Sequence, residues 1–91
     1  MADIKIRHAM SEAQLKELGV FDWPIWSKEK SCFPWTYAAD ESCYILEGEV
    51  TVTPARGNPV HIVPGDYLTF PKGLQCTWDI HQTIKKHYRF A

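Results

Sequence analysis

Two stretches in the second half of the chain decide the fold: Glu41-Ser-Cys-Tyr-Ile-Leu-Glu-Gly48 and Pro64-Gly-Asp-Tyr-Leu-Thr-Phe-Pro-Lys-Gly73. Each contains a short run of apolar and aromatic residues, a composition that favours a β-strand, and each ends at a glycine. In the second stretch, residues 64–66 and 71–73 predict tight turns, because proline presets φ and glycine relieves strain. A strand is therefore expected at residues 67–70.

The flanking sequence also reads as short strands separated by turns. Val50 and Val52 alternate with threonines and lead into a hairpin loop at residues 55–59, where Gly57 and Asn58 are able to take positive φ values. The remaining strands are expected at residues 3–8, 32–38 with an interruption at Pro34, 60–63, 75–80, and 84–90 after a break at 81–83. Short strands at such regular spacing predict an antiparallel sandwich or barrel.

The N-terminal third differs from the rest. Ser11 and Gln14 match the capping box that begins a helix, and Gly19 is expected to end it. Pro24 argues against a central strand nearby, so residues 21–26 predict an extended edge segment or an arm whose rings close one end of the barrel. We expect one domain over residues 1–91. Its parts are an N-terminal strand, helix and Trp-rich arm (1–30) and a barrel (31–91).

Composition narrows the functional classes. The chain has 91 residues, of which 45% are hydrophobic and 13% aromatic, so a few large rings supply much of the buried area. A net charge of −1 without a basic patch argues against nucleic acid, and no apolar run is long enough for a membrane span. Three cysteines without CxxC spacing fit reduced thiols, so we expect a cytoplasmic protein. Edge strands at residues 3–7 and 24–30 could pair across a homodimer.

The motif spacing resembles the two motifs of the cupin family. Six residues separate Glu41 from Gly48, and five separate Gly65 from Pro71. This resemblance implies an all-β, antiparallel jelly-roll β-barrel with one short N-terminal helix. In metal-binding cupins, two alternating histidines, a glutamate and a third histidine converge on one metal ion inside the barrel. Glu41 stands at the glutamate position.

The histidine positions are where the sequence departs from that pattern. They fall on Pro34 or Trp35, on Thr36 or Tyr37, and on Cys76. Glu41 and Cys76 alone do not make a usual metal site, because two ligands of mixed softness leave the coordination incomplete. We therefore expect no metal and no cofactor.

A narrower resemblance covers the whole chain. It is to small stand-alone cupins related to the cupin domains of ureidoglycine aminohydrolase and of ethanolamine-utilisation proteins. The segments that carry it are Trp23-Pro-Ile-Trp26, Cys43-Tyr-Ile-Leu-Glu-Gly48, Thr69-Phe-Pro-Lys-Gly73, Cys76-x-Trp78 and Lys86-His-Tyr-Arg-Phe90. Ureidoglycine aminohydrolase is a manganese enzyme, but this chain lacks the histidines that would bind manganese. Small members of this group are largely without an assigned activity, so the resemblance implies the fold and leaves the function open.

Three polar residues are candidates for chemistry. Glu41 is the best catalytic candidate, as a general acid or base inside the barrel, or else a structural carboxylate. Cys76 is the second: it needs a nearby cation or helix N-terminus to become a nucleophile, and is otherwise a small buried hydrophobe. Cys43 shares the strand parity of Glu41 and so the same face, where two thiols and a carboxylate could bind zinc.

Aromatic residues supply the expected pocket lining. Trp35 and Tyr37 share one strand face, and Trp78 shares that of Cys76, so the rings either line an apolar cavity or fill the core. The histidines are expected at the surface or in ordinary hydrogen bonds, and are His8, His61, His81 and His87. Lys85, Lys86 and Arg89 are expected on a solvated strand face. The basic ones on the last strand could alternatively attract an anionic ligand.

Three hypotheses remain open. The first is a small-molecule-binding cupin without a conventional metal centre, in which the pocket is lined by Trp35, Tyr37, Glu41, Cys43, Cys76 and Trp78. The second is a metal-dependent enzyme of unusual ligation, such as a hydrolase acting on a small nitrogenous metabolite. The third is a structural or regulatory module with a filled barrel that works through contacts with partner proteins.

Overall fold

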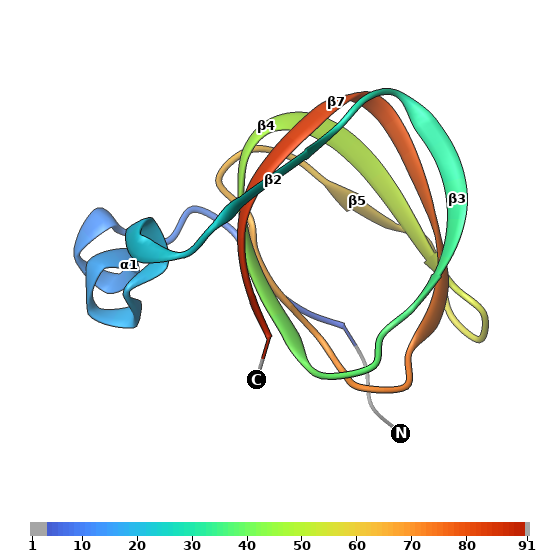
Figure 1. The fold of residues 1–91 in the computed structure, drawn as a ribbon, viewed down its shortest axis with the longest axis horizontal. Coiled ribbons are helices and arrows are strands. Elements are labelled where there is room, and N and C mark those ends of the chain that lie inside the picture. The colour runs from blue at the N-terminus through green and yellow to red at the C-terminus, as the bar shows by residue number, and fades with distance from the viewer. Residues whose placement is uncertain (1–3, 91) are drawn as a thin grey trace.

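In the computed structural model, which describes residues 4–90, the chain forms one antiparallel sheet of seven strands (Figure 1). The elements are β1 (Lys5–Arg7), α1 (Glu12–Leu18), the 3-10 helix η1 (Val20–Asp22), β2 (Ile25–Lys28), β3 (Ser31–Thr36), β4 (Glu41–Pro54), β5 (Val60–Ile62), β6 (Tyr67–Phe70) and β7 (Gln75–Phe90). Position 3, where the first strand was expected to begin, lies outside the described residues.

Two long strands, β4 and β7, form the spine of the sheet and pair with each other along most of their length. The two halves of β7 also pair with β3 and β2, while the two halves of β4 also pair with β6 and β5, and β1 pairs with β6. Figure 1 shows these strands curling around a common interior, with α1 outside the ring. The fold is the expected all-β one, but the end strands β1 and β2 do not pair, so the sheet is not closed.

The break expected at residues 81–83 is wrong. These residues continue β7, a single strand of 16 residues. The opposite strand accommodates the sharp curvature through register shifts between Ile45 and Val50, around Gly48 at φ 99°. Bulges increase the local twist and bend of a strand, so the sheet can turn here without a loop.

One smaller expectation also fails. Pro34 does not interrupt β3, which pairs with β7 alone; proline is tolerated at an edge because its missing N–H can face the unpaired side. The expected hairpin loop between β4 and β5 is present, and it forms without positive φ at Gly57 or Asn58. The N-terminal helix is confirmed: Ser11 and Gln14 form the capping box, and Gly19 ends α1 in the left-handed conformation.

The core lies on the concave face of the sheet. Its buried apolar side chains alternate along the long strands, as the period of a β-strand requires, and include Cys43, Ile45, Val50, Val52, Leu68, Phe70, Trp78, Ile80 and Ile84. No helix within residues 4–90 is both long and apolar enough to cross a membrane.

Candidate functional site

A cavity of about 210 Å³ opens on the concave face, between β2, β3, β4 and β7. Seven aromatic and two charged residues line it: Trp26, Phe33, Trp35, Tyr37, Glu41, Trp78, Lys86, Tyr88 and Phe90. The predicted residues Trp35, Tyr37, Glu41 and Trp78 are in this lining, whereas Cys43 and Cys76 are not.

The two charged residues form a buried ion pair. Lys86 Nζ lies 2.6 Å from Glu41 Oε2, and the exposed fractions of the side chains are only 7% and 5%. The same ammonium lies over the rings of Trp78 and Trp26, 4.7 Å and 5.0 Å from their centroids. Ring faces attract a cation, and they do so more strongly when water is excluded. The positive charge of Lys86 is therefore stabilised by one carboxylate and two indole rings.

The expectation that Lys86 belongs to a solvated face is wrong. Along β7, even-numbered residues from Cys76 to Ile80 point into the core, and Lys86 has the same parity as Ile84. Odd-numbered neighbours such as Lys85 face outward. If residues 75–90 had been recognised as one continuous strand, the alternation of inward and outward side chains could have identified Lys86 as inward-facing.

One oxygen of Glu41 is open to the cavity. Oε2 accepts the hydrogen bond from Lys86, and Oε1 has no hydrogen-bond partner among residues 4–90. Within that same range, every fully buried side-chain nitrogen or oxygen has a partner. Oε1 therefore retains access to the cavity and can accept a hydrogen bond from a bound molecule.

Tyr37 belongs to the same wall. It follows β3 and is held by backbone hydrogen bonds with Gly73 and Leu74, while its ring stacks on Phe70 at 4.8 Å between centroids. Trp78 Nε1 donates to Tyr37 Oη at 3.1 Å. Burial raises the pKa of the Tyr37 hydroxyl well above its usual value, and the Glu41 carboxylate adds to the effect. Tyr37 is thus a protonated hydrogen-bond donor near neutral pH.

The cysteines show no sign of activation. Burial raises the pKa of Cys43 to about 12, despite an opposing effect of Lys86, and it also raises the pKa of Cys76. Cys76 Sγ lies 3.7 Å from the carbonyl oxygen of Trp35. Both thiols are therefore held in the neutral form, which is a poor nucleophile and a poor metal ligand.

Thiol reactivity can test this assignment. In native protein at pH 8, we expect exposed Cys32 to react rapidly with a disulfide reagent such as DTNB, and Cys43 to react only after unfolding. A pKa raised from 9.0 to about 12 implies roughly 1,000-fold less thiolate, apart from the steric protection. Cys32→Ser should remove the fast phase. A second fast thiol in the folded Cys32→Ser protein would contradict the assignment.

The residues present do not fit the usual metal centre of a cupin. Within residues 4–90, no group of three or more His, Cys, Asp or Glu side chains is placed to hold a metal ion. The cation beside Glu41 is instead the ammonium of Lys86. A second cation at the same carboxylate would be repelled at close range.

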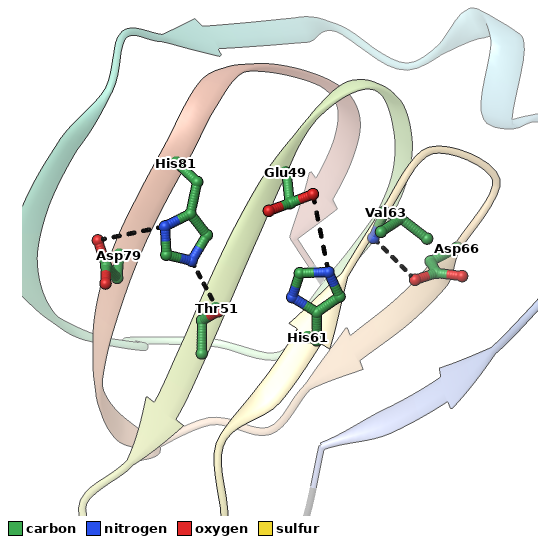
Figure 2. Close-up of polar contacts among 7 residues, drawn as sticks. All are labelled: Glu49, Thr51, His61, Val63, Asp66, Asp79 and His81. Carbon is green, nitrogen blue, oxygen red and sulfur yellow. Dashed lines mark hydrogen bonds and ion pairs between the residues drawn. The ribbon is translucent and has the colours of Figure 1, made fainter.

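The histidines lie away from the cavity, in ordinary polar contacts. Figure 2 shows His81, with Nε2 2.8 Å from Thr51 Oγ1, and His61, whose Nε2 is 3.9 Å from Glu49. His8 pairs with buried Asp66, and His87 Nδ1 donates to the carbonyl oxygen of Trp23. The expectation of surface or hydrogen-bonded histidines is confirmed.

Comparisons with known proteins support the same fold. Residues 15–88 match the family described as the EutQ-like cupin domain. A DUF861 family protein from Thermotoga maritima is 47% identical, with a TM-score of 0.93 over 98% of this chain and 100% of that one. No curated protein matches the sequence.

More distant structures carry the cupin domain within longer chains. A protein assigned as ethanolamine utilization protein Q from Salmonella typhimurium LT2 is 28% identical, with a TM-score of 0.63 over 70% of this chain and 51% of that one. The EutQ protein of Clostridium difficile is 18% identical, with a TM-score of 0.64 over 93% and 64%, which shows the fold alone. With the family match spanning most of its length, the chain belongs to the EutQ-like cupin domain family.

Proposed function

We propose that this protein binds a small planar organic molecule in the aromatic cavity, without a metal ion, and that Glu41 is its polar anchor. The observation that carries the proposal is the single charged pair, Glu41 and Lys86, set among seven aromatic side chains around a space of about 210 Å³. Ligand sites are typically apolar concavities with a few convergent polar groups.

The polar groups define the ligand that would fit. Glu41 Oε1 can accept a hydrogen bond, and Lys86 Nζ, which makes one hydrogen bond among the described residues, can donate further ones. Tyr37 Oη adds a second donor. A flat group with an adjacent donor and acceptor, such as a carboxamide on an aromatic ring, matches these groups while its ring packs against the indoles.

The mouth of the cavity is marked by Trp35 and Phe90, which line it and yet are 46% and 50% exposed. These rings give a ligand a route from solvent to the ion pair. The cavity also favours ligand binding over a module with a filled barrel, since a filled barrel would leave no space beside Glu41.

Binding of benzamide, measured by isothermal titration calorimetry, tests the proposal. We expect N,N-dimethylbenzamide, which lacks the N–H donors, to bind about tenfold more weakly, because one hydrogen bond to a charged group contributes about 1.5 kcal/mol. Glu41→Met/Lys86→Met, which replaces both charges by apolar side chains of similar length, should lose this discrimination.

The control replaces the exposed pair on the outer face of the same two strands. Glu47→Gln/Lys85→Met changes a pair 3.8 Å apart that does not line the cavity, and benzamide binding should be unaffected. If benzamide fails to bind the native protein, or binds the Glu41→Met/Lys86→Met protein equally well, the proposal is wrong.

A further inference from the structure

We propose that Lys86 is a Schiff-base lysine, and that the cavity takes a small planar aldehyde or ketone which condenses with its Nζ. This inference rests on the proposed function, because the carbonyl compound must first enter the same cavity. It assigns the site a covalent step and a chemical class of substrate.

The first support is the position of the amine. Lys86 Nζ lines the cavity while its side chain is only 7% exposed, so a bound molecule meets it with little competing water. Condensation with a carbonyl expels water, and exclusion of solvent therefore favours the product. Lys85, the adjacent residue, points to the outer face and is 46% exposed.

The second support is a proton acceptor in contact with the amine. An ammonium cannot attack a carbonyl, because its nitrogen lone pair is bound to a proton. Glu41 Oε2 lies 2.6 Å from Nζ and can take that proton, which leaves the neutral amine beside a carboxylic acid. The reverse transfer is equally short, so one residue can act as base and then as acid.

The step balances without any other reactant. The Nζ lone pair forms the C–N bond, and the carbonyl oxygen takes the proton held by Glu41. The nitrogen then returns a proton to Glu41, which passes it to the new hydroxyl group as this leaves as water. The product is a protonated imine on Lys86, and Glu41 is again a carboxylate.

The third support is the environment of the product. The protonated imine carries the same single positive charge as the original ammonium. The rings of Trp78 and Trp26, centred 4.7 Å and 5.0 Å from Nζ, face that charge, and the Glu41 carboxylate remains its counter-ion. The interactions that hold the lysine therefore also stabilise the intermediate.

The test uses benzaldehyde with sodium cyanoborohydride, which reduces an imine to a stable secondary amine. Intact mass and peptide mapping of the wild-type protein should place the first equivalent of label on Lys86. Glu41→Gln should slow this labelling by roughly 100-fold, the lower range for loss of a general acid–base. Lys85→Arg is the matched control and should label like the wild type.

Folding is checked by circular dichroism for each variant, and the site assignment on the wild-type protein does not depend on any variant. Label spread over exposed lysines, with Lys86 no faster than Lys85, would overturn the proposal. So would a folded Lys86→Arg protein that labels at the wild-type rate.

The benzamide experiment separates this failure from failure of the proposed function. If benzamide binds but benzaldehyde does not label Lys86, the Schiff base is wrong and ligand binding stands. If neither molecule engages the cavity, both are wrong.

Discussion

Replacing Lys86 with methionine is expected to lower the free energy of unfolding by about 3–5 kcal/mol, the cost of removing one partner from a buried ion pair. The substitution keeps an unbranched chain of similar length against Trp26 and Trp78. It leaves the Glu41 carboxylate, whose side chain is 5% exposed, without its counter-charge. Urea denaturation followed by tryptophan fluorescence measures the change.

Two controls isolate the buried charge as the cause. Lys85→Met removes a cation from the next position, where the partner Glu47 is 3.8 Å away and the exposed fractions are 46% and 69%. Exposed pairs contribute about 0–1 kcal/mol, so this variant should unfold close to the wild-type midpoint. Glu41→Met/Lys86→Met should recover most of the loss, because no unpaired charge remains. If Lys86→Met and Lys85→Met lower the free energy of unfolding by the same amount, Glu41 and Lys86 are not a tightly coupled buried pair.

Gly48→Ala is expected to be at least as damaging, with a loss above about 3 kcal/mol. A Cβ at this position would lie 2.4 Å from the carbonyl oxygen of Thr83 and 2.7 Å from Ile84 Cα. Both contacts are with the backbone of β7, which cannot rotate away as a flexible side chain could. The φ of 99° adds strain, because an L-residue rarely adopts that conformation.

Gly73→Ala is the matched control for the close approach of the β7 backbone to Gly48. Gly73 also has a positive φ, 87°, but an added Cβ would have nothing within 4 Å. Only backbone strain of about 1–3 kcal/mol remains, so Gly73→Ala should be clearly less destabilised in thermal melts. Equal losses for the two variants would mean that the approach of β7 to Gly48 contributes nothing.

Part of the fold was predictable from the sequence because it depends on local residues, and part was not because it depends on contacts such as that between Gly48 and β7. Turns at residues 64–66 and 71–73 and the helix from Glu12 to Leu18 depend on local preferences, so their residues could be recognised directly. The continuity of β7 through residues 81–83 depends on the register shifts in β4, which lie more than thirty residues earlier. No local pattern contains that information.

The candidate site divides in the same way. Two arguments, the resemblance to the cupin motif for Glu41 and strand parity for Tyr37 and Trp78, were enough to name residues that do lie together around one cavity. They were not enough to exclude Cys43 and Cys76, because an inward-facing residue can pack in the core beneath a cavity without lining it. Burial depth depends on the residues of neighbouring strands.

The amino-acid order by itself determined the strand-rich antiparallel fold, the capped helix and the supply of inward-facing rings, since these follow from alternation, turn residues and helix capping. The cupin type of the fold was implied by the resemblance of its two motifs. Only the tertiary structure decided that a lysine would meet Glu41 across 45 residues of chain. That pairing requires β4 and β7 to align along a curved, bulged spine, which sets the register that brings Lys86 inward. A buried charge without a partner is strongly destabilising, so the Glu41 carboxylate and the Lys86 ammonium stabilise each other. The indole rings of Trp26 and Trp78 also contact the ammonium.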